Sequence, residues 1–323
     1  MLIFATTHGH DYTVGTLTDG SFDAPLPTVA AMTYDNLWRA EDFADATYIF
    51  SDLERLVPWE LQLASALYRA LRAAGMRCLN DPARVMARYE LLRTLARIKF
   101  NPFEAYRAED RPRPKHFPVF IRAESDHLRP LRGLIHTQVA LDAALDDIVA
   151  CGTPLRGLLV IEFCAQPIAP GAWRKFGTFR IGEAMHLDHA VVEDSWLVKY
   201  GRAGFSTPAM FQAEYDAVAA NSYVERIRPA FEAAGIEYGR ADHATVDGRE
   251  VVYEINTAPY LFPPHKQRAE IRDRAQALSR ARMGSLFHAI DSGDGRPRPV
   301  DTGPSLTAFR HANPDPPVVP KRP

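Results

Sequence analysis

Gly239-Arg240-Ala241-Asp242-His243 and Tyr253-Glu254-Ile255-Asn256-Thr257 are the two stretches of this 323-residue sequence that decide its fold. Each has the look of a strand, with polar residues at alternate positions. Val246-Asp247-Gly248-Arg249 lies between them and is a turn signal, because Asp and Gly tolerate the left-handed backbone of a tight hairpin. The sequence therefore predicts an antiparallel hairpin.

Four polar residues of this hairpin are predicted to gather on one face. Successive strand residues point to opposite faces, so Arg240 and Asp242 share a face of the first strand. Glu254 and Asn256 likewise share a face of the second strand. The two pairs coincide if residue 242 lies opposite 254, which requires an odd number of loop residues, such as Asp247-Gly248-Arg249. The carboxylates of Asp242 and Glu254 then lie within roughly 5 Å of each other, which is destabilising without a cation between them.

A divalent metal is the cation that suits this group. Asp242, Glu254 and Asn256 present two carboxylates and an amide oxygen, a set suited to Mg²⁺, which keeps its other positions for water and phosphate. In the metal-free protein the carboxylates should repel each other, so Asp242→Asn is expected to be neutral or stabilising. The alternative is an ordinary surface hairpin with solvated charges, since Asp-Gly hairpins are common.

Composition bounds the class of protein. Lys and Arg number 38 and Asp and Glu 40, so the net charge of -2 gives no basic field for nucleic acid. No apolar run approaches the length of a membrane span, and the apolar start at residues 1–5 is too short for a signal peptide. We therefore expect a cytoplasmic protein with no membrane partner. Cys78, Cys151 and Cys164 are odd in number and widely spaced, which indicates neither disulfides nor a zinc site.

The N-terminal part of the chain alternates strands with helices, which predicts a small parallel sheet. The expected strands are residues 2–6, 28–33 and 46–50, and the clearest helix runs from Pro58 to Gly75. Open sheets of this kind bind ligands at strand ends, although ordinary surface residues occupy such positions more often. The polar residues at these ends are His8, His10, Asp52 and Arg55.

The C-terminal end differs in composition. Eight prolines lie between Pro297 and Pro323, mixed with Gly and charged residues. Such a segment is expected not to bury enough apolar surface to build a core. Residues 291–323 are therefore predicted to form a disordered tail, and removal of residues 296–323 is predicted to leave folding intact.

The hairpin also resembles a known family signature. Gly239-Arg240-Ala241-Asp242, the turn, and Tyr253 to Pro259 are similar to the C-terminal signature of the ATP-grasp superfamily. The form is closest to that of D-alanine:D-alanine ligase and of ribosomal-protein glutamate ligase-like enzymes. The resemblance implies that Asp242, Glu254 and Asn256 hold Mg²⁺ or Mn²⁺ on ATP, and that Arg240 stabilises a developing oxyanion.

The resemblance implies an α/β and α+β fold in which two α+β subdomains clasp ATP behind an N-terminal α/β domain. The expected boundaries place this pre-ATP-grasp domain at residues 1–83 and the small ATP-grasp subdomain at residues 84–155. The C-terminal subdomain then covers residues 156–290, and the Pro-rich tail covers residues 291–323.

The same resemblance implies a nucleotide site. Arg122, at the end of a predicted strand, would hold phosphate, and Lys199 would reach the γ-phosphate from a mobile segment. Glu162 and the main chain near Phe163 and Cys164 would contact adenine and ribose. The alternatives are a surface arginine at a strand end for Arg122 and, for Glu162, a strand-end glutamate paired to a structural arginine. Arg180 is expected to face the substrate and to act with Arg240 and Lys199.

Two departures from the family pattern concern phosphate binding. The helix that usually carries a nucleotide-binding lysine reads Arg88-Tyr89-Glu90-Leu91-Leu92-Arg93, so that role falls to Arg88, to Arg93 or to no residue. The loop after Arg122 has Ala123-Glu124-Ser125-Asp126-His127 in place of glycines, which removes the easy approach of backbone amides to phosphate.

The implied reaction is that of an ADP-forming carboxylate-amine ligase. A small-molecule or peptide carboxylate would be activated as an acyl phosphate and then coupled to an amine, giving an amide or peptide. One alternative is a kinase of the same fold that phosphorylates a hydroxyl. Another is a nucleotide-binding protein whose catalysis has decayed. The sequence identifies neither the carboxylate nor the amine, and it leaves open whether the chain forms a homodimer.

Overall fold

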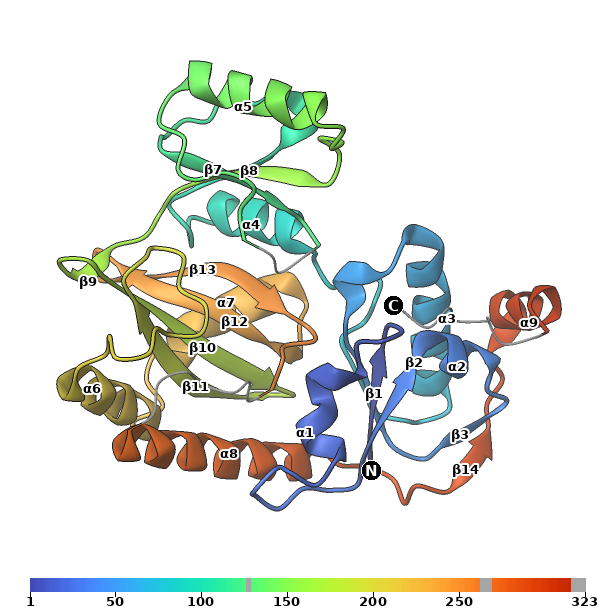
Figure 1. Ribbon diagram of the computed structural model, residues 1–323. Helices are drawn as coiled ribbons and strands as arrows, with labels where there is room; N and C mark the ends of the chain where they lie inside the picture. The colour runs from blue at the N-terminus through green and yellow to red at the C-terminus, as the bar shows by residue number, and fades with distance from the viewer. Residues whose placement is uncertain (126–128, 262–268, 315–323) are drawn as a thin grey trace. The chain divides into compact units, whose positions relative to one another are not determined.

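The computed structural model of the protein describes residues 1–125, 129–261 and 269–314 (Figure 1). The chain divides into two compact units. The first comprises Met1–Val85, Thr257–Leu261 and Met283–Pro323. The second comprises Met86–Asn256 and Phe262–Arg282. The expected boundary after residue 83 lies close to the observed one, but two later stretches of the chain also belong to the first unit.

The first unit contains a four-stranded parallel sheet, as the alternation of strands and helices predicted. Its order is β2-β1-β4-β5. The strands are β1 (Leu2–Thr6), β2 (Val29–Thr33), β4 (Thr47–Phe50) and β5 (Cys78–Leu79). The helices of this part are α1 (Gly15–Thr18), α2 (Tyr34–Arg39) and α3 (Pro58–Ala73), with 3-10 turns at Asp11–Val14 and Leu53–Arg55. The three predicted strands and the helix from Pro58 are confirmed.

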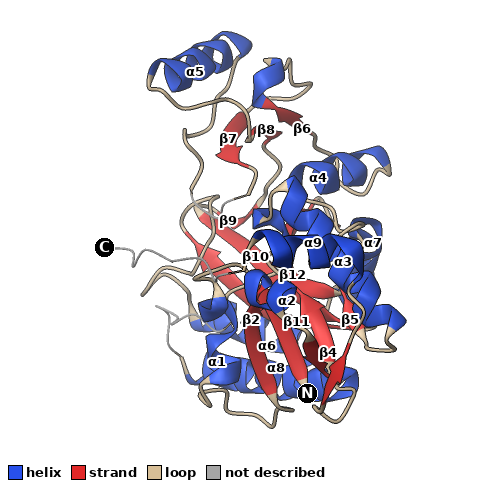
Figure 2. Cartoon of the chain, turned by 90° about the vertical axis from the view of Figure 1, so that its right-hand side faces the viewer, coloured by secondary structure: helices blue, strands red, loops and turns tan. Residues whose placement is uncertain are grey.

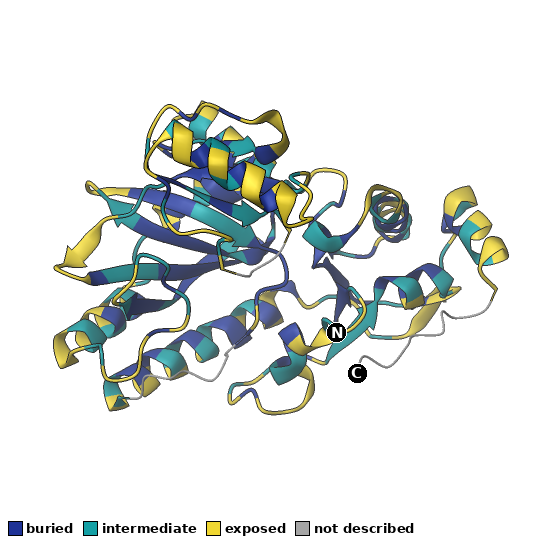
Figure 3. Ribbon diagram, turned by 45° about the horizontal axis from the view of Figure 1, so that its top comes forward, coloured by how far each residue is buried: buried dark blue, intermediate teal, exposed yellow. Residues whose placement is uncertain are grey.

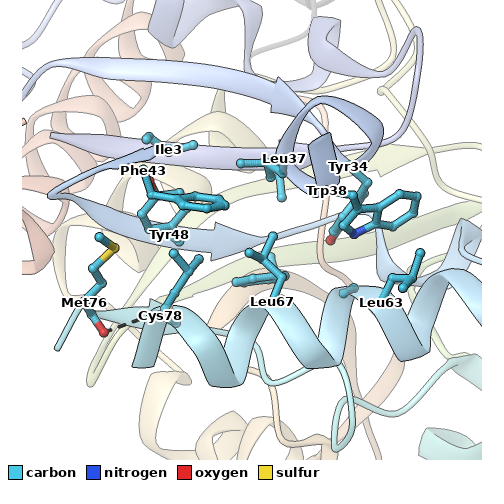
Figure 4. Packing of buried hydrophobic residues seen from close by; sticks show 14 of the residues in the cluster. Ile3, Tyr34, Leu37, Trp38, Phe43, Tyr48, Leu63, Leu67, Met76 and Cys78 are labelled. Carbon is cyan, nitrogen blue, oxygen red and sulfur yellow. Dashed lines mark hydrogen bonds between the residues drawn. The ribbon is translucent and has the colours of Figure 1, made fainter. Parts of the chain in front are cut away.

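The core of the first unit lies between this sheet and α3. Leu63 and Leu67 of α3 pack against Tyr48 and Trp38, as Figure 4 shows. Helical spacing of the apolar residues places them all on the face of α3 that meets the sheet. Pro58 begins the helix, where its missing N–H is not required.

The predicted disordered tail is wrong for the described residues 291–314. Strand β14 (Pro297–Pro299) pairs with β3 (Asp42–Ala44), and helix α9 (Gly303–Ala312) follows it. Leu306 of α9 is fully buried in the core of the first unit, and Phe309 packs against it. Apolar residues spaced three apart were too few to stand out among the prolines. The predicted boundaries also separate these residues from the sheet that they complete.

The second unit begins with a three-stranded antiparallel sheet of order β6-β8-β7. Its strands are β6 (Ala105–Arg107), β7 (Val119–Ala123) and β8 (Leu158–Glu162), and a 3-10 turn spans Ala108–Asp110. Helix α5 (Gln138–Ala150) covers one face and α4 (Arg88–Arg97) the other, as Figures 1 and 2 show. The expected subdomain boundary at 155/156 is therefore misplaced, because β8 completes this sheet. Asp81 and Pro82 form a turn, and the next helix begins only at Arg88.

A larger antiparallel sheet follows, with the order β11-β10-β12-β13. Its strands are β10 (Ala172–Ile181), β11 (Ala184–Glu193), β12 (Tyr238–Val246) and β13 (Arg249–Asn256), and the short β9 (Pro167–Ala169) pairs with β10. The long strands of this sheet are largely buried (Figure 3). The accompanying helices are α6 (Pro208–Ala219), α7 (Val224–Ala234) and α8 (Glu270–Ile290).

The fold class is α/β and α+β, as predicted from the sequence. Pro229 lies inside the continuous helix α7. Helix α8 begins at Glu270, and residues 262–268 lie outside the described part of the chain. None of the helices in the described ranges is long and apolar enough to cross a membrane.

Candidate functional site

The hairpin β12–β13 has the register that the sequence predicted. Asp242 lies opposite Glu254, and Arg240 lies opposite Asn256. Residues paired across a ladder point to the same face of a sheet, so the four polar side chains share one face. Asp242 and Asn256 are buried, although both are polar. The alternative of an ordinary surface hairpin with solvated charges does not fit this burial.

The predicted loop of this hairpin is wrong. Val246 pairs with Arg249, so the loop contains only Asp247 and Gly248, both with positive φ (48° and 76°). Such backbone suits the two-residue turns that match strand twist. A β-bulge at Tyr253, which has no partner in the ladder, supplies the extra residue that the register needs.

Cationic side chains already lie beside both carboxylates. The Lys175 ammonium donates to Asp242 Oδ2 at 2.7 Å. Arg88 donates to Glu254 Oε2, and Arg122 lies 3.6 Å from the same oxygen. All of these side chains are at most 16% exposed. The expected repulsion between the two carboxylates is therefore offset by the protein's own charges.

Lys175 was not among the predicted site residues. Arg88 was one of two candidates for the missing lysine, and it also donates to the carbonyl oxygens of Ala123 and Glu124. Arg93, the other candidate, is exposed and donates to Tyr89 within its own helix. Lys175 gave no local signal, because only the pairing of β10 with β12 brings it to Asp242.

The carboxylate of Asp242 is suited to a metal. Burial opposes its ionisation, but Lys175 and Arg240 outweigh burial and hold its pKa below the usual range. Its Oδ1 is buried and has no hydrogen-bond partner among the described residues, with Arg240 Nε at 3.5 Å. Asn256 lies beside Glu254, its amide nitrogen 3.4 Å from Oε1. An ionised oxygen without a hydrogen bond fits a divalent cation.

The metal would depend on few protein ligands. In the part of the chain that the structure describes, no three His, Cys, Asp or Glu side chains gather as a metal site. A hard cation here would combine Asp242, Glu254 and Asn256 with oxygens from a bound ligand and water. The donor set that the sequence indicated is thus brought together.

A cavity lies against this group, lined by both sheets of the second unit. Aromatic side chains form one part of its wall: Phe120 and Phe163 each pack against Trp196, with ring centroids 5.2 and 5.5 Å apart. Trp173 packs on Phe163 at 6.1 Å. Flat aromatic walls of this kind suit a planar ring system, because rings stack or meet edge to face.

Another part of the cavity wall is charged. Arg122, Lys175 and Lys199 line it together with Asp242 and Glu254. Burial lowers the pKa of Lys199, and the neighbouring Arg122 lowers it further, while Glu254 raises it. The structure therefore brings Lys199, Arg122 and Lys175 to one cavity, and phosphate binding by Lys199 and Arg122 stays a prediction.

The backbone of Lys199 is anchored by an acid. Glu193 Oε1 accepts hydrogen bonds from the N–H groups of Lys199, Tyr200 and Gly201 at 2.9, 2.8 and 2.7 Å. Gly201 has a φ of 80°, which a residue with a side chain rarely adopts. This turn presents Lys199 to the cavity.

Glu162 lines the cavity, but its carboxylate is already bound by donors from the protein. It accepts from the N–H groups of Glu104, Lys115 and His116 at 2.8 to 3.0 Å and from the Tyr106 hydroxyl at 2.9 Å. A buried acid in a strand needs such partners. These partners are mainly backbone amides and not the structural arginine of the alternative, and contact of Glu162 with the nucleotide stays a prediction.

Phe163 and Cys164 line the cavity, and contact of their main chain with a nucleotide stays a prediction. The Cys164 carbonyl accepts from the Tyr253 hydroxyl at 2.8 Å. Burial raises the pKa of the Cys164 thiol to about 11, so it is no nucleophile at neutral pH.

Arg180 does not lie with the other predicted residues. It pairs with Gly239 across the ladder, and alternation turns its side chain to the face opposite Arg240 and Asp242. Its guanidinium donates to the carbonyl oxygens of Gly182 and Ile236 at 2.9 and 3.1 Å. The prediction that Arg180 faces the substrate is wrong, because the register of β10 was unknown.

The first unit holds a separate polar cluster. Asp52 is buried, and it accepts from the Thr7 N–H at 3.0 Å and lies 3.0 Å from Arg55 Nε. His10 Nδ1 lies 3.3 Å from the same carboxylate. Three of the four predicted strand-end residues thus meet. His8 is exposed.

Comparison with known proteins gives structural likenesses only. No family model matches the sequence, and no curated protein matches it. A D-alanine–D-alanine ligase from Bacillus anthracis is similar with a TM-score of 0.47 and 12% identity, over 97% of this chain and 100% of that one. A RimK domain ATP-grasp protein from Sphaerobacter thermophilus is similar with a TM-score of 0.45 and 15% identity, over 89% and 99%. The ATP-grasp ligase PsnB is similar with a TM-score of 0.46 and 13% identity, over 85% of this chain and 95% of that one.

Proposed function

We propose that this chain is an ATP-grasp enzyme that activates a carboxylate with ATP and couples it to an amine. The observation that carries the proposal is that aromatic and charged side chains line the same cavity of the second unit. Phe163 and Trp196 suit the adenine ring, and Arg122 and Lys199 suit the phosphates. Asp242 lines the same cavity.

In this proposal the main chain at Phe163 and Cys164 meets the edge of adenine, while the Glu162 carboxylate keeps its hydrogen bonds to backbone amides. Asp242, Glu254 and Asn256 hold Mg²⁺ or Mn²⁺. The metal, when bound, neutralises charge on the phosphate oxygens. Lys175 is paired with Asp242 at 2.7 Å and is thereby directed to the same phosphates.

The first chemical step is attack of the substrate carboxylate on the γ-phosphorus, which gives an acyl phosphate and ADP. Negative charge builds up on the transferred group, where Lys199 and Arg122 stabilise it. The amine then forms a C–N bond to the acyl carbon, and phosphate leaves with the electron pair of the C–O bond. Arg240 stabilises the oxyanion of that step.

The test is ADP formation in the presence of ATP, Mg²⁺ and a panel of amino acids and short peptides, each with and without hydroxylamine. An acyl phosphate gives a hydroxamate with hydroxylamine, whereas a phosphate ester does not. ADP together with a hydroxamate supports the ligase. ADP with a phosphorylated hydroxyl and no hydroxamate indicates a kinase. Nucleotide binding without any ADP would show a binding protein and contradict the proposal.

A matched pair of variants ties the activity to this site. Lys199→Ala should abolish most ADP formation, because Lys199 lies in the charged part of the cavity wall. Lys115→Ala is the control, since Lys115 is 65% exposed and pairs with Glu104 away from the cavity.

A further inference from the structure

A histidine lies on the same face of the large sheet as the carboxylates. His189 on β11 pairs with Gly177 on β10, and Gly177 pairs on its other side with Asp242. Paired residues share a face, so the imidazole and the Asp242 carboxylate project from the same side of the sheet. They are two strands apart, which is about 10 Å between Cα atoms.

Gly177 leaves room for the imidazole to lie between these two strands. A Cβ atom on Gly177 would stand 2.5 Å from Cε1 and 2.8 Å from Nε2 of His189. The Cε1–Nε2 edge of the ring therefore lies directly over Gly177, on the line from His189 to Asp242. The φ of Gly177 is not positive, so the backbone conformation does not require glycine. Glycine is needed here because it lets the His189 ring approach the backbone closely.

A buried relay holds the other edge of the ring. His189 Nδ1 lies 2.6 Å from Asp188 Oδ2, and the Ser279 hydroxyl donates to Asp188 Oδ1 at 2.5 Å. Asp188 reaches this position because it is a bulge residue, without a partner in the β10–β11 ladder. A carboxylate on Nδ1 places the ring proton there and makes Nε2 the basic nitrogen.

Burial favours the neutral, basic form of the ring. Burial lowers the pKa of His189, and the charge of Arg240 lowers it further. The carboxylates of Asp188 and Asp242 act in the opposite direction but do not outweigh burial. Burial alone would raise the pKa of Asp188, but His189 and Ser279 hold it far below the usual range. The side chain of His189 is 13% exposed, so a ligand can reach part of the ring.

We propose that Nε2 of His189 is the general base that takes a proton from the amine acceptor. The inference rests on the proposed ligase function and assigns a role that neither the sequence signature nor the predicted site contained. Arg240, the oxyanion residue, is opposite Phe179, two positions along β10 from Gly177 on the same face. His189 and Arg240 thus lie on either side of strand β10, on the same face of the sheet.

The proton balance of the step is complete. The acceptor arrives as an ammonium and gives one proton to Nε2, which becomes an imidazolium facing the ionised Asp188. The nitrogen lone pair forms the C–N bond at the acyl-phosphate carbon. The C–O bond breaks, its electron pair leaves on phosphate, and the second proton of the nitrogen passes to that phosphate.

The experiment compares two acceptors in His189→Asn, with the carboxylate that gives ADP in the wild type. Hydroxylamine is already unprotonated at neutral pH and needs no base, whereas a primary amine does. We expect amine coupling to fall about 100-fold or more, in line with a lost general base. Hydroxamate formation should stay within a few-fold of the wild type. Thermal stability and nucleotide binding confirm that the variant is folded.

Asp188→Asn provides a second variant that keeps the ring but removes the carboxylate that sets the tautomer. It should show the same split between amine and hydroxylamine, with a smaller loss. Equal losses with both acceptors, or full amine coupling in His189→Asn, would overturn the base role alone. A wild type that forms no ADP with any carboxylate would instead contradict the proposed function on which the role depends.

Discussion

Replacement of Asp242 by Asn should destabilise the metal-free protein. From the hairpin register alone the opposite is expected, because Asp242 faces Glu254. The structure reverses that sign, since Lys175 donates to Asp242 at 2.7 Å and Arg240 lies 3.5 Å from its other oxygen. An amide oxygen in that place can still accept a hydrogen bond, but it leaves the Lys175 ammonium without its opposite charge.

The magnitude follows from the bond that is lost. A hydrogen bond to a charged group contributes about 1.5–3 kcal/mol. Relief of the repulsion from Glu254 offsets part of this, so we expect a net loss of about 1.5 kcal/mol. For a domain of 150–250 residues that is a fall in Tm of about 3–6 °C.

The assay is thermal or urea unfolding in the presence of a chelator, followed as a function of pH. The folded pKa of Asp242 lies below its unfolded value of about 3.9. Its stabilising contribution is therefore fully present above about pH 4 and is lost as the pH falls through the folded pKa. The difference in the free energy of unfolding between wild type and Asp242→Asn should be constant near neutral pH and should disappear in acid.

Two controls sharpen the result. Lys175→Met should cost a similar amount, and the double variant should cost less than the sum of the two, because the residues form one pair. Glu250→Gln is the second control, because Glu250 is another buried acid of the same hairpin, bonded to Thr245 and close to His243. Glu250 is not one of the proposed metal ligands, so this variant should leave the stabilisation of the protein by Mg-ATP unchanged. An Asp242→Asn protein as stable as the wild type without metal would refute the reasoning.

Three further outcomes are expected. Lys199→Ala should keep nucleotide affinity within several-fold but slow ADP formation sharply, because its charge acts on the transition state; parallel losses in binding and turnover would argue against this. Leu306→Ala should cost about 2–5 kcal/mol in unfolding experiments, as for other fully buried leucines, and an unchanged Tm would show that α9 adds nothing to the core. Gly177→Ala should displace the His189 ring and reduce amine coupling without altering nucleotide affinity, as measured by calorimetry, and undiminished coupling would count against the placement of the ring.

The hairpin illustrates what the sequence can predict. Alternation within β12 and β13 placed Arg240, Asp242, Glu254 and Asn256 on one face, since period-two alternation is a local property. The bulge at Tyr253 was not predictable, because it depends on how the two strands pair and not on either strand alone.

Non-local pairing explains the residues that were missed or misplaced. Lys175 and Arg180 lie on the same strand, and only its register against β12 puts the first at Asp242 and the second on the opposite face. His189 reaches its position through the bulge at Asp188, which the sequence did not signal. The C-terminal helix was missed because Leu306 finds its core in the N-terminal part of the chain.

The central claim is that Asp242 and Glu254 hold a metal on a nucleotide bound in the aromatic cavity. The most direct measurement is a crystal structure of the protein with Mn²⁺ and a non-hydrolysable ATP analogue, with anomalous scattering to locate the metal. We predict Mn²⁺ within about 2.0–2.3 Å of Asp242 Oδ1 and a Glu254 oxygen, with the base between Phe163 and Trp196. A nucleotide bound elsewhere, or one bound in the cavity with its metal away from both carboxylates, would contradict the claim.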